Sequence, residues 1–118
     1  MLCHLTDSFH VPMGEKSASP ATGFLQRTFV KWMALRFPAP WPKGVQTRPE
    51  IEQGTGGGTP PGDFERDRAE LIQAIEQFTD SNRRFQCQPH PMFGAMDEWE
   101  WMRWGYLHTD HHLRQFGA

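Results

Sequence analysis

The last helix-like segment of the chain carries three of its six histidines, at positions 108, 111 and 112. His108 and His112 are four residues apart, so on a helix their side chains project from one face with Cβ atoms about 5–6 Å apart. Imidazole is the commonest protein ligand for transition metals such as zinc and nickel. The pair therefore indicates part of a metal site, with two unrelated histidines as the alternative. His111 lies about 100° round the helix from His112 and is expected to face elsewhere.

A third ligand would have to come from another helix, and the opposite end of the chain offers His4. The alternative for His4 is a packed or exposed side chain without a metal. Cys3 is adjacent to His4, so on a helix it would diverge from any metal that His4 binds. His10 and His90 lie near expected chain bends and have no histidine at helical spacing. We therefore keep these three residues out of the expected site.

The segment that carries the histidine pair has clear helix boundaries. Asp97 and Glu100 form a pattern typical of a capping box, and Gly117 ends the helix. Gly105 lies one turn before His108 on the same side, where it either leaves a gap beside a metal or admits a bulky neighbour. Gln115, one turn after His112, either orients a ligand or lies on the surface. The expected face comprises Trp101, Gly105, His108, His112 and Gln115.

Three further segments have helical patterns: 1–11, 22–36 and about 63–80, the last capped by Asp63. Its expected apolar face comprises Phe64, Leu71, Ile72, Ile75 and Phe78. In the segment 22–36, Leu25, Phe29, Trp32 and Met33 form a stripe opposite a basic side. Such a helix can lie on a membrane surface. We expect the simpler arrangement, in which the stripe faces the core.

The remaining chain is expected to be irregular. Prolines dominate the start of the loop 37–62, and glycines fill its second half, which lacks the Gly-Lys-Ser/Thr of a phosphate-binding loop. Residues 81–96 form a second loop. No segment alternates like a β-strand. We expect one all-α domain over residues 1–118, with its helices packed as an antiparallel bundle.

Composition narrows the class of partner. A formal net charge of −2 gives no basis for nucleic-acid binding through bulk electrostatics. Two cysteines far apart do not form a disulfide framework, and no signal peptide or apolar run of about 20 residues is present. We therefore expect a cytoplasmic protein with neither nucleic acid nor membrane as a partner.

Several ordered motifs resemble a known superfamily. These are Met1-Leu2-Cys3-His4-Leu5-Thr6-Asp7, Pro40-Trp41-Pro42-Lys43-Gly44, a Gly-Thr-Pro-Pro stretch before Asp63-Phe64-Glu65, His90-Pro91-Met92-Phe93-Gly94 and Asp110-His111-His112-Leu113-Arg114-Gln115-Phe116-Gly117. In this order they are similar to a bacterial branch, of unknown function, of the DinB/YfiT-like superfamily. The resemblance covers essentially the whole chain.

The resemblance implies a four-helix bundle that holds a divalent metal. Members typically use one histidine of the second helix and two of the last, which correspond here to His4, His108 and His112. Asp7 and Gln115 are weak candidates for supporting positions beside these ligands. Zinc or nickel is the expected metal. Relatives include thiol-dependent transferases and isomerases that use bacillithiol, mycothiol or glutathione, and others are related to metal-dependent hydrolases, so a low-molecular-weight thiol is a second expected cofactor.

The chain departs from the pattern at its start. Relatives begin with a complete first helix, and this chain is expected to be a shortened form without most of it. An additional short helix and the long loop lie between the second and third bundle helices. A missing helix would leave an apolar groove, which a second copy could fill. The alternative to a metal-dependent transferase or hydrolase is therefore a non-enzymatic helical module acting through that groove or as a homodimer. A metalloprotease is not expected, because no His-Glu-x-x-His pattern is present.

Overall fold

The computed structural model describes residues 1–20, 22–42, 48, 57–80 and 87–117. Every regular element in these residues is a helix, which confirms the all-α class. They are α1 (Leu2–His10), the π-helical turn η1 (Gln26–Val30), α2 (Lys31–Arg36), α3 (Phe64–Thr79) and α4 (Glu98–Gln115). The chain divides into two compact units, which are described separately: Met1–Ser19 with Thr47–Gln88, and Pro20–Gln46 with Pro89–Ala118.

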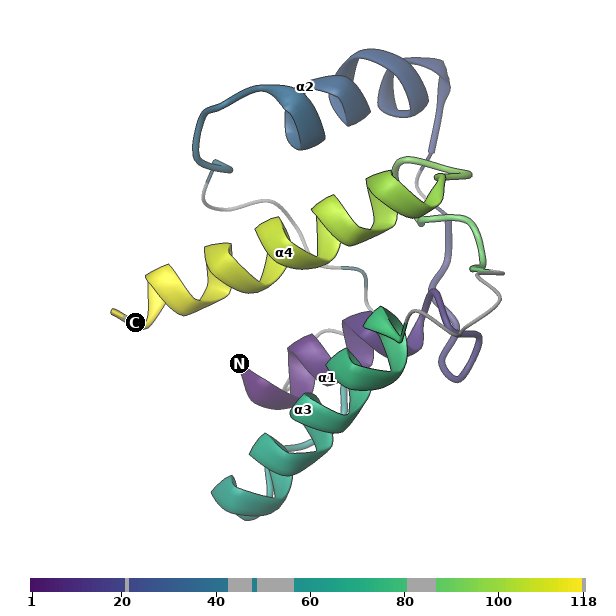
Figure 1. The fold of residues 1–118 in the computed structure, drawn as a ribbon. Helices are drawn as coiled ribbons and strands as arrows, with labels where there is room; N and C mark the ends of the chain where they lie inside the picture. Colours follow the sequence, from purple (N-terminus) through teal and green to yellow (C-terminus); the bar gives the residue numbers. More distant parts are fainter. Residues whose placement is uncertain (21, 43–47, 49–56, 81–86, 118) are drawn as a thin grey trace. The chain divides into compact units, whose positions relative to one another are not determined.

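The first unit is built on α1 and α3, which lie side by side (Figure 1). Phe9 of α1 meets Phe78 of α3 with ring centroids 5.1 Å apart. Leu5 and Leu71 are buried on the same two helices. Apolar side chains on one face of each helix therefore form the core of this unit.

The start of α3 follows the sequence, and its buried face does so in part, since Leu71 and Phe78 are buried as expected. The Asp63 side chain accepts a hydrogen bond from the Arg66 backbone N–H, as the predicted cap requires. Phe64 and Ile72, both expected on the apolar face, are exposed. The buried positions of this helix are Asp67, Leu71, Ala74 and Phe78. The buried face starts at Asp67. Its carboxylate can be buried because it accepts a hydrogen bond from the Gly62 N–H.

Polar contacts hold the segment before α3 on α1. Both carboxylate oxygens of the buried Asp7 accept hydrogen bonds from Thr59, one from its N–H and one from its hydroxyl. The Lys16 ammonium lies 3.6 Å from Asp7 and donates to the Gly57 carbonyl. These contacts pair a buried charge with donors and a cation, which offsets the cost of removing it from water.

The second unit is built on η1, α2 and α4, with α2 running along α4 (Figure 1). The predicted capping box is present, since Asp97 accepts from the Glu100 N–H and Glu100 accepts from the Asp97 N–H. Leu35 is buried, and its carbonyl accepts a hydrogen bond from Arg103 Nε of α4. Lys31 of α2 forms an ion pair with Glu100 at 3.0 Å. These contacts fix which side of α2 faces α4.

The expectation that the stripe on 22–36 faces the core is wrong. Leu25, Phe29, Trp32 and Met33 are all exposed, with 61% of Phe29 accessible to solvent. The helix is also divided between a π-helical turn and a regular α-helix. The core side is instead taken by Leu35 and by the side chains that pair with α4. Hydrophobic spacing alone does not determine which side of a helix finds a neighbour.

Some predictions fall on residues outside the described part of the chain. Residues 43–47 and 49–56 of the loop 37–62, and residues 81–86 of the second loop, belong to this group. The bundle arrangement and the single domain over 1–118 stay predictions. In the described residues no helix is both long and apolar enough to cross a membrane.

Candidate metal-binding histidines

His108 and His112 lie one turn apart on α4, as the sequence predicts. Their ring centroids are 4.8 Å apart, with 42° between the ring planes. Both residues are half-buried, so the rings are partly shielded from solvent. The helix α4 begins at its capping box and continues to Gln115, so both histidines lie within it and share a face through its 3.6-residue period. The helix therefore brings together two imidazole rings, each of which can offer a nitrogen to a metal.

Two tryptophans surround the histidine pair within the second unit. Trp104, one turn before His108 on α4, is buried and has its ring centroid 5.0 Å from that of His108. Trp41 comes from the segment after α2, and its ring meets His108 edge to face at 6.1 Å. Gly105, next to Trp104 on α4, is also buried. The His108 ring thus has aromatic neighbours on two sides, which restrict its contact with water.

The other polar groups of this turn are oriented differently. The Asp110 carboxylate accepts a hydrogen bond from Arg114 at 2.8 Å, along the outer side of the helix. The His111 ring lies 6.0 Å from Trp41 and 5.4 Å from His112, at 73° to the latter. Gln115, proposed to support a ligand, is exposed at the end of α4.

His4 belongs to the first unit, where it is half-buried on α1. Its carbonyl accepts a hydrogen bond from the Ser8 hydroxyl one turn later. Asp7, the predicted supporting carboxylate, is bonded to Thr59 and lies beside Lys16. The geometry therefore gives Asp7 the role of anchoring the segment before α3 to the helix that carries His4.

Cys3 has the surroundings of a packed thiol. It is buried, with Sγ 3.9 Å from the Pro60 carbonyl. Burial, together with the nearby Asp67 carboxylate, raises the pKa of the Cys3 thiol. Because the thiolate is the nucleophile and the metal ligand, this environment suppresses both reactivities. The exclusion of Cys3 from the metal site stays a prediction.

His90 has a structural role that sequence reasoning missed. Its ring stacks on Phe93 at 4.5 Å and lies within 6 Å of Trp101 and Trp104. Nδ1 accepts hydrogen bonds from the backbone N–H groups of Met92 and Phe93. Burial lowers the pKa of His90 to about 3. His90 is therefore a neutral histidine that closes a turn against the tryptophans, and the His-Pro-Met-Phe-Gly motif was the available signal.

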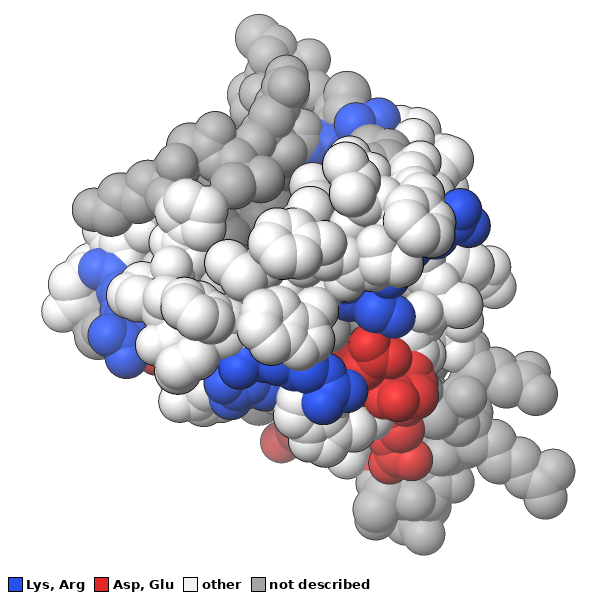
Figure 2. All heavy atoms as spheres, turned by 90° about the horizontal axis from the view of Figure 1, so that it is seen from above, with Lys and Arg blue, Asp and Glu red and all other residues white. Residues whose placement is uncertain are grey.

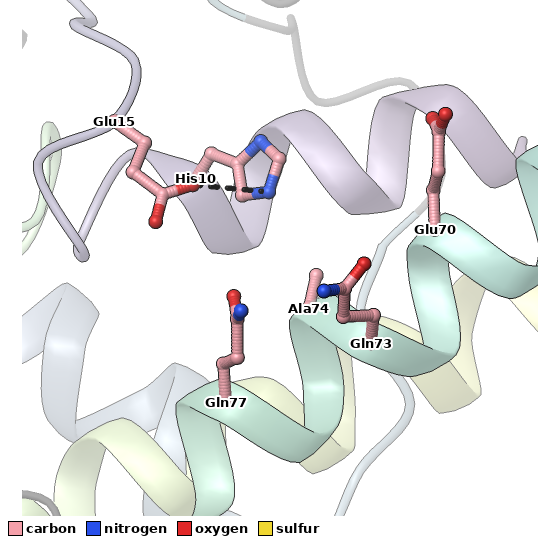
Figure 3. A pocket seen from close by; sticks show the side chains of 6 residues that line it. All are labelled: His10, Glu15, Glu70, Gln73, Ala74 and Gln77. Carbon is pink, nitrogen blue, oxygen red and sulfur yellow. Dashed lines mark ion pairs between the residues drawn. The ribbon is translucent and has the colours of Figure 1, made fainter.

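A separate polar cavity of about 260 Å³ lies in the first unit, between the end of α1 and the middle of α3 (Figure 3). His10 and Glu15 face each other on one side, with His10 Nε2 3.4 Å from the Glu15 carboxylate. Glu70, Gln73 and Gln77 of α3 line the other side, together with Ala74. The residues predicted for the metal site do not line this cavity.

The matching family model covers the complete chain and has the description "Protein of unknown function (DUF1569)" for residues 1–118. Comparisons with curated proteins and with solved structures found no match. These comparisons assign no activity, so the histidine geometry on α4 is interpreted by its own chemistry. The chain belongs to the DUF1569 family.

Proposed function

We propose that this protein binds a divalent metal through His4, His108 and His112 and uses it in thiol transfer or hydrolysis. The observation that carries the proposal is the pair on α4, whose imidazole rings are 4.8 Å apart on one half-buried face. The ordered motifs that resemble the DinB/YfiT-like superfamily add His4 as the third ligand. Both the superfamily assignment and the third ligand are part of the proposal.

The donor set suits zinc or nickel, for which imidazole is a common ligand. Three protein ligands leave a coordination position open, as in catalytic rather than structural zinc sites. A divalent metal there would supply a Lewis acid that activates a water molecule or an incoming thiol at neutral pH. Zinc or nickel and a low-molecular-weight thiol are thus the proposed cofactors.

The surrounding residues have positioning roles in this proposal. Trp104 and Trp41 pack against the His108 ring and limit its rotation and its contact with water. Asp7 holds the segment before α3 on α1, which stabilises the helix that presents His4. Gln115, one turn after His112, would orient a ligand or a bound water.

Metal binding is tested on chelator-treated protein by calorimetric titration with zinc and nickel and by elemental analysis after dialysis. We expect one metal per chain, with affinity reduced at least tenfold in His108→Ala, His112→Ala and His4→Ala. His111→Ala is the matched control, since it changes a neighbouring histidine of the same turn. Unchanged metal content in His108→Ala and His112→Ala would refute the proposal. Loss in these two variants but not in His4→Ala would remove the third ligand.

The enzymatic part needs its own assay. The metal-loaded protein is incubated with a low-molecular-weight thiol and an electrophilic acceptor, and thiol consumption is followed with and without chelator. Chelator-sensitive consumption that His112→Ala abolishes supports a thiol transferase. Metal binding without thiol consumption or ester hydrolysis would leave the metal site and remove the proposed reaction.

A non-enzymatic helical module is the second candidate function. The exposed apolar side chains of η1 and α2 favour it, because a surface patch of this kind typically marks an interaction site. Light scattering on the eluted protein distinguishes the two candidates. A stable homodimer that binds no metal supports the module, whereas a metal-loaded monomer with thiol-dependent activity supports the enzyme.

A further inference from the structure

The segment 24–37 presents a large apolar surface to solvent within the second unit. Its members are Phe24, Leu25, Phe29, Trp32, Met33 and Phe37, which together are called the η1–α2 apolar face. Phe24 is 75% exposed and Trp32 is 50% exposed. Figure 2, which looks onto this side, shows large uncharged side chains grouped together, with Lys and Arg side chains and a group of Asp and Glu side chains beside them. Single exposed apolar residues are normal, but a contiguous group is typical of a binding surface.

Contacts on the other side of α2 hold this face outward. Leu35 is buried, its carbonyl is bound by Arg103, and Lys31 is paired with Glu100. The Trp41 indole N–H donates to the Ala34 carbonyl at 2.7 Å. A rotation that turned the apolar face toward α4 would break these contacts together. The outward orientation is therefore a property of the folded unit.

The segment that carries the face is itself cationic and aromatic in composition. Residues 20–46 contain four Lys/Arg residues and no Asp or Glu: Arg27, Lys31, Arg36 and Lys43. Arg36 is exposed, with its guanidinium 4.5 Å above the ring of Trp99, which is itself half exposed. Trp and Phe on the apolar side combined with Lys and Arg on the polar side are typical of helices that lie in the lipid headgroup region.

We propose that the η1–α2 apolar face docks on an anionic lipid surface. The helix would lie in the plane of the membrane, with its aromatic side chains inserted at the acyl boundary and Arg36 near the phosphates. A lipid surface is favoured over a second copy because a two-fold interface places the same patch of both chains together. That arrangement would bring two copies of the segment 20–46 against each other, and this segment has no Asp or Glu of its own to pair with the exposed Arg36 of the other copy. The proposal is independent of the metal site.

The test is co-sedimentation of the full chain with sucrose-loaded vesicles. One set contains phosphatidylcholine alone. The other contains phosphatidylcholine with about 30% phosphatidylglycerol, which gives the vesicles a negative surface potential. We expect at least tenfold stronger binding to the anionic vesicles, weakened by added salt. The double variant Phe29→Ser/Trp32→Ser should lose at least tenfold of this affinity. Circular dichroism should show an unchanged fold, since both side chains are exposed.

The matched control is Phe64→Ser/Ile72→Ser, which removes two exposed apolar side chains from α3 in the other unit. This variant should bind anionic vesicles like the wild type. Equal loss in both double variants, or no binding of the wild type to either vesicle, would overturn the proposal. A homodimer that Phe29→Ser/Trp32→Ser dissociates, without vesicle binding, would assign the face to a second copy. Binding retained in His108→Ala and His112→Ala would show that the surface acts without the metal site.

Discussion

Trp41 and His108 meet edge to face, with ring centroids 6.1 Å apart and 86° between the ring planes. The same indole donates its N–H to the Ala34 carbonyl at 2.7 Å. One side chain thus joins the end of α2 to the histidine pair of α4. Because Trp41 is half-buried, its hydrogen bond is shielded from competition with water.

Replacing Trp41 with Phe tests this connection. Phe retains an apolar ring but cannot donate to Ala34, so we expect a loss of about 1 kcal/mol in the free energy of unfolding. Urea unfolding followed by circular dichroism measures it. Trp32→Phe is the control, since Trp32 is exposed on the same segment and should leave stability within about 0.5 kcal/mol of wild type. Equal stability of the two variants would contradict a structural role for the Trp41 hydrogen bond.

His90 predicts a pH dependence of stability. Burial lowers the pKa of folded His90 to about 3, whereas the unfolded value is about 6.5. Between these values the unfolded chain binds a proton that the folded chain does not. Stability from the neutral ring is therefore complete above about pH 6.5 and decreases as the pH falls toward 3, by up to about 1.4 kcal/mol per pH unit.

His90→Asn removes this titration while keeping an acceptor for the Met92 and Phe93 N–H groups. The variant should be less stable at pH 7, because the ring contacts with the tryptophans are lost. Its unfolding free energy should nevertheless change less between pH 7 and pH 5 than that of the wild type. Urea unfolding at both pH values measures this change in unfolding free energy for the variant and for the wild type. An identical change in the wild type and in His90→Asn would show that His90 is not held neutral by burial.

The histidine pair could be predicted because its geometry is local. His108 and His112 are placed by α4 alone, and the Asp97/Glu100 capping box fixed where that helix begins. Trp41 could not be placed beside them from spacing, since it reaches His108 through contacts between distant segments. The all-α class followed in the same way from capping signals and periodicity within each segment.

Apolar spacing predicted the buried Leu71 and Phe78 of α3, but not the rest of that face or the buried side of α2. On α3, Asp67 is buried because the Gly62 N–H satisfies it, and Phe64 is exposed. On α2, the ion pair of Lys31 with Glu100 turns the polar side inward. Periodicity counts apolar residues but not the partners that a neighbouring helix supplies, so the stripe on 22–36 was assigned incorrectly and the face of α3 only in part correctly.

The ionised carboxylate of Asp67 should stabilise the folded protein above about pH 4. The Gly62 N–H, bonded to its carboxylate, is the main cause that lowers the pKa of Asp67, and Arg66 adds to it. Since the unfolded pKa is about 3.9, the stabilisation is present above about pH 4 and is lost as the pH falls through the folded value. Asp67→Asn should therefore be less stable than wild type at pH 7, with a smaller difference at pH 3. Urea unfolding at both values measures this. A difference independent of pH would show that the charge of Asp67 does not matter.

Leu35 of α2 is buried, whereas Phe29 of η1 is exposed to solvent. Leu35 is 1% exposed, so Leu35→Ala should cost about 2–5 kcal/mol through lost burial and the cavity left behind. Phe29→Ala should change stability by less than about 0.5 kcal/mol, because the larger side chain is already in solvent. Urea unfolding of both variants measures the contrast. The reverse order would mean that Phe29 is covered in the folded protein, and the η1–α2 apolar face would then not be available to a lipid surface.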